Sequence, residues 1–449
     1  MRTGIFGFAM RRLAISSSPL ITNHGNVASI QTPEANTTQF QYEATYSRLT
    51  QITDAMTPAN VTLFAYPSLT QSTITNPMGK VTTITFNGAG QPLSVTDPLT
   101  HQTTFEYDSA GNLAATVDAL GNRVERYYDA ASRLLALRDP LGRFTRFQYD
   151  PLNRVTVIQD PLSGFTRFSY DANGNLLSVA DAKNQTTGYI YDVMDRLIVR
   201  KDALNRQETY QYDRLGNLIQ FKDRKNQTTT FVYDALNRRT GATYPDATAT
   251  FGYDAINRLT SVNDSVGGSI TWVYDTVSGG HHPRVLETTT AGTMTVEYDE
   301  IGRRVKLSAT GQVDTTYTYD AASQFKTVTK GVQTVTLNYD DAGRRTSLTY
   351  PNGVVTSYGY DNAYRLLSIG HVKTPPTIEA LTYAYDKGGN RIAPRHVGVA
   401  MPDSQVSTPA ILSGSSITVA PGPSLSMPYV PSAAGKSTTI TPAVSESMP

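Results

Sequence analysis

The 449-residue sequence has no cysteine, one tryptophan and only six histidines. The absence of cysteine excludes a disulfide framework, a cysteine-based zinc finger and a thiol nucleophile. Charged residues make up 17% of the chain, below the usual share, and the net charge is only +1. A chain this close to neutral has no strong field to draw it to nucleic acid or to an anionic membrane. We therefore expect no nucleic-acid partner.

Long apolar runs are also missing. No window reaches the ~18 apolar residues of a membrane-spanning helix, so we expect no membrane span. Residues 1–20 make a poor signal peptide, because Arg11 and Arg12 follow the short apolar stretch instead of preceding it.

What the sequence has instead is a repeat. The dipeptide Tyr-Asp occurs 14 times, and its first seven copies are spaced 21 residues apart. Such a fixed phase indicates a repeated structural unit. The regular pairs are Tyr107-Asp108, Tyr128-Asp129, Tyr149-Asp150, Tyr170-Asp171, Tyr191-Asp192, Tyr212-Asp213 and Tyr233-Asp234. The later pairs begin at Tyr253, Tyr274, Tyr298, Tyr319, Tyr339, Tyr360 and Tyr385, with spacings of 20 to 25 residues.

Each unit contains the residue types that form two turns. Three residues after the Asp of each pair stands a turn former, such as Gly111 or Asn153. A second Asp, such as Asp118, follows ten residues after the first and is itself followed by Gly, Ser or Asn three places on. Asp accepts backbone N–H bonds at the start of a turn, and Gly or Asn tolerates the left-handed conformation that closes it.

Between the turns the sequence alternates. Residues 144–149 place Thr145, Phe147 and Tyr149 on one face and polar residues on the other, which is the period-2 pattern of a strand. The other half of the unit, as in residues 134–137, is more uniformly apolar and could be covered on both faces. We predict two short strands and two turns per unit, and an all-β fold: a spiralling ribbon of repeated β-hairpins that forms an open spiral or partial shell.

The regularity of the repeat divides the chain into four parts. Residues 1–38 are an irregular N-terminal segment, and 39–97 hold degenerate repeats, including Phe86-Asn87 in the Tyr-Asp phase. We expect this second segment to cap the ribbon's edge. Residues 98–396 are the clear array. Residues 397–449 are rich in Ser, Thr and Pro, and we expect a flexible tail there.

The array resembles the YD repeat of the RHS family. The resemblance rests on residues 170–176, Tyr-Asp-Ala-Asn-Gly-Asn-Leu, followed by Asp181 and by the next pair at Tyr191. That family includes bacterial RHS proteins, the shell subunits of insecticidal toxin complexes, and the teneurins. It implies a β-ribbon that spirals into a hollow shell, commonly around a toxic C-terminal segment in bacterial members. The resemblance also implies an extracellular or bacterial cell-surface location.

The sequence departs from the family after Asn390, where we find neither the plug that cuts off the cargo nor a folded toxin. Asp139-Pro140-Leu141-Gly142 is similar to the acidic Asp-Pro-x-Gly pattern of the family's cleavage region. It lies mid-array in the phase of a turn, which favours a structural role.

We therefore expect a non-enzymatic RHS-type scaffold, part of a toxin-encapsulating or cell-surface shell, with a toxin or other polypeptide as cargo. One alternative is a surface adhesin that binds carbohydrate, with a cell-surface glycan or protein as partner. A weaker alternative is a fragment of a self-processing toxin.

The Tyr-Asp pairs allow two interpretations. They could form a ladder of sugar-binding sites, each an aromatic platform with a carboxylate. The favoured interpretation is structural: Tyr stacks on its counterpart in the next unit and Asp makes the turn. On that interpretation, replacing Tyr191 by Ala should cost about 3 kcal/mol of stability.

Other site motifs are absent or weak. None of the histidines, at 24, 101, 281, 282, 371 and 396, forms a zinc spacing, and no calcium loop is present. Gly435-Lys436-Ser437 lacks the first glycine of a phosphate-binding loop. Arg200-Lys201 and Arg224-Lys225 could form a basic stripe, although a solvated face is favoured. We therefore expect no catalytic residue, cofactor or metal.

Overall fold

The fold is a single β-sheet. The computed structural model describes residues 20–21, 25–32, 35–276, 283–373 and 377–397. These residues form 36 strands in one sheet, with no helix among them. No described helix could therefore serve as a membrane span. The expected all-β ribbon is confirmed.

The strands of the first half are short. They are β1 (Leu20–Ile21), β2 (Val27–Gln31), β3 (Thr37–Tyr42), β4 (Leu49–Thr53), β5 (Val61–Ser68), β6 (Gln71–Thr75), β7 (Val81–Phe86), β8 (Pro92–Thr96), β9 (Gln102–Tyr107), β10 (Leu113–Val117), β11 (Arg123–Tyr128), β12 (Leu134–Arg138), β13 (Phe144–Tyr149), β14 (Val155–Gln159), β15 (Phe165–Tyr170), β16 (Leu176–Ala180), β17 (Thr186–Tyr191) and β18 (Leu197–Lys201).

The second half continues in the same way and includes a few longer strands. They are β19 (Gln207–Tyr212), β20 (Leu218–Lys222), β21 (Thr228–Tyr233), β22 (Arg239–Thr243), β23 (Thr248–Tyr253), β24 (Leu259–Asp264), β25 (Gly268–Thr276), β26 (Pro283–Thr289), β27 (Gly292–Tyr298), β28 (Arg304–Ala309), β29 (Thr315–Tyr319), β30 (Phe325–Lys330), β31 (Gln333–Tyr339), β32 (Arg345–Thr349), β33 (Val355–Tyr360), β34 (Leu366–Val372), β35 (Thr377–Tyr385) and β36 (Arg391–Val397).

The strands form one continuous antiparallel meander. Each strand pairs with the strand before it and the strand after it, as β13 does with β12 and β14. In the regular array a six-residue odd-numbered strand alternates with a five-residue even-numbered strand. We call the turn after an odd strand the YD turn and the turn after an even strand the second turn. All YD turns therefore lie along one edge of the ribbon, the YD-turn edge, and all second turns along the other, the second-turn edge.

The two edges differ in their register. On the YD side each even strand contains one extra residue, because Tyr107 pairs with Leu113 and Glu106 with Ala115. On the second-turn side the pairing of β10 with β11 runs without a shift. A bulge bends its strand and increases the local twist. Repeated on the same side in every regular unit, these bulges bend the ribbon consistently in one direction.

The wall is one sheet thick. In β13 the side chains of Thr145, Phe147 and Tyr149 are half-buried, and those between them are exposed, as the alternation predicts. In β12, however, Leu135 is 41% exposed. The expectation that such a strand could be covered on both faces is wrong for Leu135, because none of the described residues forms a second layer over it. The buried hydrophobic residues among those described are Ile84, Ala115, Phe231, Ala242 and Ala249.

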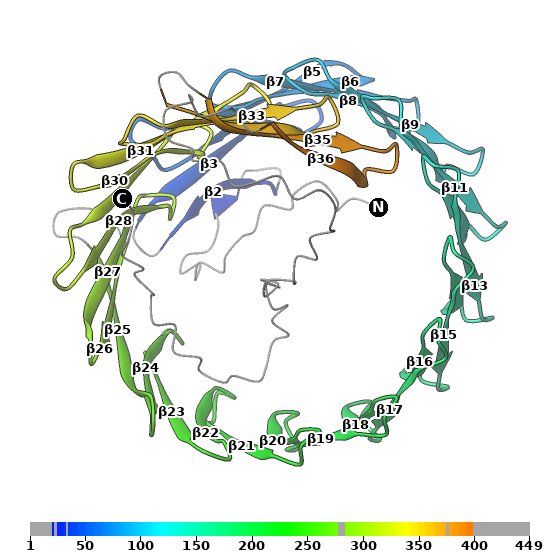
Figure 1. Cartoon of the computed structure of the whole chain (residues 1–449), viewed down its shortest axis with the longest axis vertical. Coiled ribbons are helices and arrows are strands. Elements are labelled where there is room, and N and C mark those ends of the chain that lie inside the picture. The colour runs from blue at the N-terminus through cyan, green and yellow to red at the C-terminus, as the bar shows by residue number, and fades with distance from the viewer. Residues whose placement is uncertain (1–19, 22–24, 33–34, 277–282, 374–376, 398–449) are drawn as a thin grey trace, which may run out of the picture.

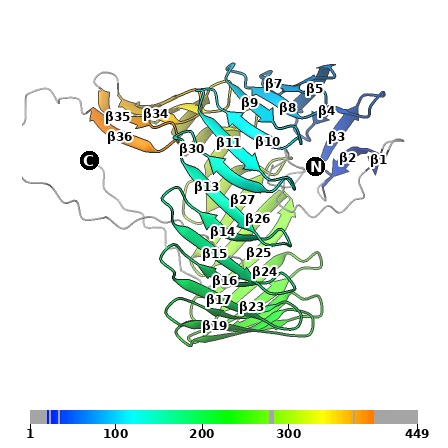
Figure 2. The ribbon, with the colours of Figure 1, turned by 90° about the vertical axis from the view of Figure 1, so that its right-hand side faces the viewer.

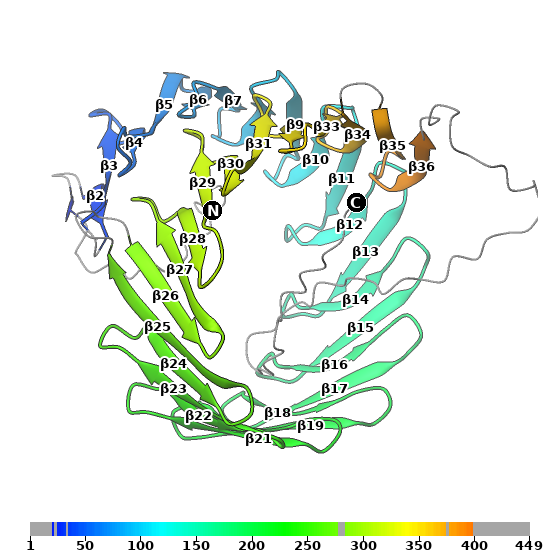
Figure 3. The ribbon, with the colours of Figure 1, turned by 60° about the vertical axis from the view of Figure 1, so that its left-hand side comes forward.

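The ribbon closes into a ring and then overlaps itself. Figure 1 shows the ring, with β33 to β36 reaching the region of β5 to β9. Figure 2 shows that the overlapping strands are displaced along the axis of the ring. Figure 3 shows the same ring from a third direction. The molecule is therefore an open spiral of slightly more than one coil, which confirms the expected architecture.

The degenerate segment 39–97 contains strands of the same sheet, β3 to β8. Asn87 accepts the backbone N–H groups of Ala89 and Gln91 at 3.0 and 2.9 Å, as an Asp does in a YD turn. Several sequence features lie outside the described residues: His24, His281, His282, Gly435-Lys436-Ser437, residues 398–449 and most of residues 1–24.

Candidate functional site

The YD turn is a compact hydrogen-bonded unit. In the turn after β13, one carboxylate oxygen of Asp150 accepts the backbone N–H groups of Leu152 and Arg154 at 2.9 and 3.0 Å. The other oxygen accepts Nε of Arg154 at 2.6 Å. Asn153 has φ of 63°, the left-handed conformation predicted for that position. Hydrogen bonds from Arg154 hold the pKa of Asp150 below its usual value.

The Tyr of each pair links one unit to the unit before it. In every pair but that of Tyr274 it is the last residue of its odd strand, and in most pairs its hydroxyl donates to a backbone carbonyl in the preceding unit. In the regular array these bonds, at 2.8–3.0 Å, join Tyr107 to Pro92, Tyr128 to Leu113, Tyr149 to Leu134, Tyr170 to Val155, Tyr212 to Leu197 and Tyr233 to Leu218. Tyr191 ends β17 in the same position.

The fifth residue of the YD turn links its unit to the next one. Arg196 donates to Asp192 within its own turn at 2.8 Å and to the carbonyl of Asp213 in the next turn at 2.8 Å. Its guanidinium lies 4.9 Å from the ring centroid of Tyr212, a cation–π distance. The ring partner of Tyr212 is thus Arg196, where the sequence predicted another Tyr. The same arrangement joins Arg154 to Tyr170.

Asn performs the same role with a shorter side chain. Nδ2 of Asn175 donates to Asp171 of its own turn at 2.9 Å and to Asp195 of the next YD turn at 2.6 Å. This explains why the sequence alternates between Arg and Asn at this position: both residues reach the Asp behind them and the turn ahead of them.

One Tyr-Asp pair departs from this pattern. Tyr274 and Asp275 lie inside the nine-residue strand β25, so that Asp275 does not open a turn. Asp275 is instead bound across the hairpin by Arg284, at 2.8 and 2.6 Å. The longer hairpin accounts for the irregular spacing after this pair.

The overlap of the two coils forms a seam between opposite edges of the ribbon. Second turns of the first coil face YD turns of the second coil. Nζ of Lys80, between β6 and β7, lies 2.7 Å from Asp341, between β31 and β32. Arg303 contacts the sulfur of Met56 at 3.4 Å, across 247 positions of sequence. We call this contact, between turns of residues 54–143 and turns of residues 299–390, the inter-coil seam.

The best-connected contact in the seam is made by Tyr364. Its hydroxyl donates to Asp97, which also accepts from the ring of His101 at 3.0 Å. Partial burial acts to raise the pKa of Asp97, but the hydrogen bonds from Tyr364 and His101 outweigh it and lower the pKa. Burial, followed by the bond to Asp97, raises the pKa of Tyr364. The seam therefore favours an ionised Asp97 and a neutral Tyr364.

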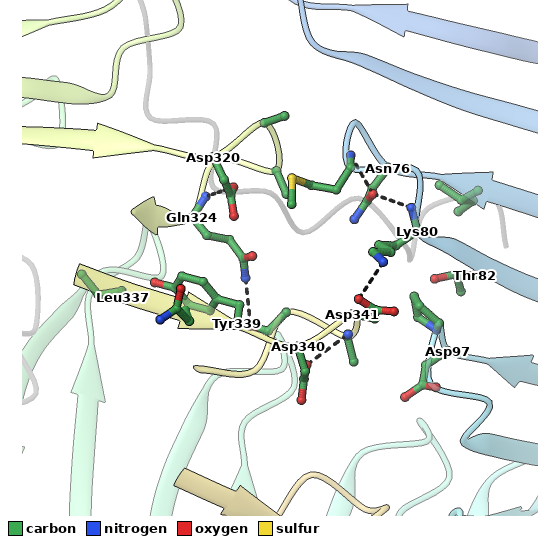
Figure 4. Close-up of a pocket in the computed structure, with 18 of the residues that line it drawn as sticks. Asn76, Lys80, Thr82, Asp97, Asp320, Gln324, Leu337, Tyr339, Asp340 and Asp341 are labelled. Atoms are coloured by element: carbon green, nitrogen blue, oxygen red, sulfur yellow. Dashed lines mark hydrogen bonds and ion pairs between the residues drawn. The ribbon is translucent and has the colours of Figure 1, made fainter. Parts of the chain in front are cut away.

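A cavity of ≈ 820 Å³ lies in the seam. Figure 4 shows its walls: Asn76, Lys80 and Asp97 on one side, and Asp320, Gln324 and Asp341 on the other. Gln324 donates to the carbonyl of Gly343 at 2.9 Å, so that its amide already bridges adjacent turns. No group of three or more metal-ligating side chains occurs in the described part of the chain. The polar groups at this cavity join turns together, and we assign them no catalytic role.

The arginines of the possible basic stripe, Arg200 and Arg224, are paired with acidic side chains. Arg224 lies 2.8 Å from Glu208 and 3.4 Å from Asp202, and Arg200 lies 3.3 Å from Glu208. These pairs are part of the wall's polar surface.

Comparison with known families agrees with this geometry. The teneurin YD-shell family matches residues 145–284, and the RHS repeat family matches residues 86–123 and 339–374. The array is therefore similar to the YD repeats of these two families over the matched segments. No curated protein matches the chain.

Solved structures of Tc toxin proteins share the fold of the array. The TcdB2-TccC3 crystal structure has a TM-score of 0.56 at 15% identity, covering 86% of this chain and 29% of that chain. The TcdB2-TccC3-Cdc42 structure has a TM-score of 0.53 at 16% identity, with 76% and 23% covered. A Photorhabdus luminescens Tc holotoxin pore gives 0.50 at 15% identity, with 82% and 23% covered. This chain therefore spans less than a third of the length of these YD-repeat relatives.

Sequence reasoning identified the YD turns but missed the seam. His101 was considered only as a metal ligand, and Tyr364 was not singled out. One signal was available: Tyr364 occupies the turn position that elsewhere holds Gly, Asn, Ser or Asp. Its φ is 67°, which is unfavourable for a bulky residue.

Proposed function

We propose that this YD-repeat chain is the non-enzymatic wall of a hollow shell that encloses a polypeptide cargo. The observation that carries the proposal is the inter-coil seam. A single-layer sheet becomes a barrier only if consecutive coils meet edge to edge, and Lys80, Asp97, Asp341 and Tyr364 make such a contact. The neighbouring Tc toxin structures support a toxin as cargo through their fold alone. We place this shell outside the cell or on its surface.

The wall chemistry fits a mechanical role. The hydroxyls of the repeat tyrosines are used in bonds to backbone carbonyls, and arginines such as Arg154 and Arg196 cover ring faces. A tyrosine engaged in this way offers little free ring face to a sugar. We therefore propose the Tyr-Asp ladder as the structural framework of the wall.

We also propose that residues 39–97 have a second role besides capping the edge. The second turns of this segment supply Met56, Lys80 and Asp97 to the seam. A chain that lacks this segment would lose most of the first coil's contribution to the seam.

A protease-protection experiment tests the shell. A protease-sensitive reporter is joined to the C-terminus of the full chain and exposed to protease. The matched control carries the same reporter on a chain with Lys80→Glu and Tyr364→Asn, which opens the seam and keeps a residue suited to positive φ. We expect the reporter to survive several-fold longer on the intact chain. Equal digestion of the two fusions and of the free reporter would rule out enclosure.

A further inference from the structure

About one coil of the second-turn edge lies outside the seam. Leu141 and Leu162 occupy the same position in successive second turns, two residues after the Asp. Leu141 lies in the seam, where a Cβ added at Gly388 would be 3.2 Å from its Cδ1, and it is 40% exposed. Leu162 is 91% exposed, and Leu204 is 71% exposed. Because the turn position is the same, the difference reflects the coil that covers Leu141.

The YD-turn edge of the first coil is also uncovered and apolar. Leu152, Met194, Leu215 and Leu236 occupy the tips of YD turns and are 64%, 61%, 74% and 67% exposed. Three YD turns of the seam have a small residue at the same position, Ala322, Ala342 and Ala363, while Ile301 occupies it in the turn that contacts Met56. Large aliphatic side chains that recur on an exposed edge mark a contact surface.

We propose that the free second-turn edge, residues 160–353, docks onto the free YD-turn edge, residues 43–258, of a second copy of this chain. The docking continues the seam that the chain already makes with itself, because the free second-turn edge begins at the turn after Leu141. The two edges have similar lengths in sequence. A stacked copy would thus cover Leu162 and Leu204 in the way that the second coil covers Leu141.

The charges on the two edges agree in sign with those of the seam. In the seam, Lys80 on the second-turn edge pairs with Asp341 on the YD-turn edge. On the free edges, Lys183 and Lys225 are exposed on the second-turn side and Asp195 on the YD side. A head-to-tail contact would bring these lysines to the edge that carries Asp195, as the seam brings Lys80 to Asp341, although Arg214 is also exposed on the YD-turn edge.

Such a contact leaves one edge of each kind free at the ends of any stack, so the association does not close. We expect stacks that lengthen with protein concentration. This inference does not require a cargo, and the protection experiment above can succeed or fail independently of it.

The test measures the mass of the full chain by sedimentation velocity over a range of concentrations. We expect the wild type to show multiples of the monomer mass that increase with concentration. The variant with Leu162→Glu and Leu204→Glu should remain monomeric. The matched control is Ile190→Glu with Val232→Glu, which adds the same charge at strand positions on the face of the sheet that are 55% and 62% exposed. This control should associate as the wild type does, and circular dichroism should show that both variants are folded.

Cross-linking determines which edges meet. The chain has no cysteine, so Leu204→Cys and Ala89→Cys place single exposed thiols on the second-turn edge and on the part of the YD-turn edge that would face Leu204. With a flexible bis-maleimide that spans about one repeat unit, we expect dimers when the two variants are mixed and few when either is alone. A wild type that is monomeric at every concentration, association unaffected by the Leu162 and Leu204 changes, or equal cross-linking in either variant alone would overturn the proposal.

Discussion

The hydroxyl of Tyr364 donates a hydrogen bond to Asp97, a residue 267 positions earlier in the sequence. Tyr364 has a φ of 67°, and its ring lies 4.9 Å from the guanidinium of Arg344 and 6.3 Å from the ring of His101. A bulky residue with positive φ persists only where its surroundings compensate for the strain. The contact with the first coil supplies that compensation, so that this one turn residue serves the closure of the ring.

Removing the hydroxyl of Tyr364 should loosen the seam. We expect Tyr364→Phe to cost about 1 kcal/mol, the value of a typical hydrogen bond, and to increase hydrogen exchange at residues 97–101. Tyr364→Asn should open the seam further. It should also relieve the backbone strain in the turn, because Asn tolerates positive φ. Tyr350→Phe, at a second turn outside the seam, is the control and should leave exchange at 97–101 unchanged. Equal exchange in all three variants would argue against a role for this contact.

Truncation of a repeat tyrosine should destabilise the array locally. We expect Tyr212→Ala to cost about 3 kcal/mol, because a half-buried ring and the support for Arg196 are lost together. Tyr212→Phe should cost about 1 kcal/mol, through loss of the bond to the carbonyl of Leu197. Denaturant unfolding measures both changes. An unchanged unfolding midpoint for the Ala variant would contradict the structural role of the tyrosines.

The fifth residue of the YD turn, Arg196 in this example, should be replaceable only by residues whose side chains can make the same hydrogen bonds. Arg196→Asn keeps the bond to Asp192, as Asn175 does with Asp171, but loses the stacking on Tyr212. We expect a cost of about 1 kcal/mol for Asn and a larger cost for Ala, in thermal unfolding. Arg196→Lys should behave more like Ala than like Arg, since an ammonium group lacks the planar fork that reaches Asp192 and Asp213 together. Full rescue by Lys would show that charge alone is sufficient.

The local features of this fold could be predicted from the sequence because they repeat. The 21-residue period, the Asp that opens each turn and the residue with positive φ are encoded within a few positions of one another. The alternation in β13 fixed which side chains face the same side. The exposure of Leu135 could not be predicted in this way, since the same apolar run of sequence occurs in strands of a single-layer wall and in strands of a sheet covered on both faces.

The seam could not be predicted because it depends on accumulated curvature. Whether Lys80 meets Asp341 depends on the bend contributed by every unit between them, and a small change per unit would shift the register by a whole turn. The ring partners of the tyrosines were also wrong, because period-2 alternation gives the face of a side chain but not which neighbour covers it. The presence of Tyr at position 364, where the turn chemistry favours small or polar residues, is the one sequence signal of the seam.

Acid should destabilise the array. Hydrogen bonds within the turns lower the pKa of Asp129, Asp150, Asp192 and Asp234 below the ordinary value. A carboxylate whose pKa is lower in the folded state stabilises the fold above its unfolded pKa, about 4, and that contribution is lost as the pH falls through the folded-state value. We therefore expect the melting temperature, followed by circular dichroism, to be flat from pH 7 to about 5 and to fall below about pH 4.

A combined Asp→Asn variant at these four turns is the control for the acid effect. Asn87 shows that an amide oxygen can accept the same two backbone bonds in this fold. The variant should be less stable than the wild type at pH 7, where it lacks the charge partners of the turn arginines, but its stability should fall less steeply in acid. Parallel pH profiles for the two proteins would assign the acid sensitivity to other groups.

Charge reversal at Lys80 should separate the attraction across the seam from the stability of each turn. Both side chains of the Lys80–Asp341 pair are partly exposed, 37% and 47%, so the pair itself is worth about 0.5 kcal/mol. Lys80→Asp places like charges together at the seam, and we expect increased exchange at residues 76–80 and 341–343 with little change in the unfolding midpoint. Asp341→Lys should have the same effect, and the double reversal should restore protection because the attraction is re-established. At about 1 M salt, where screening acts over about 3 Å, the single and double variants should converge. If the double reversal exchanges as fast as either single variant at low salt, the coils are held by other contacts.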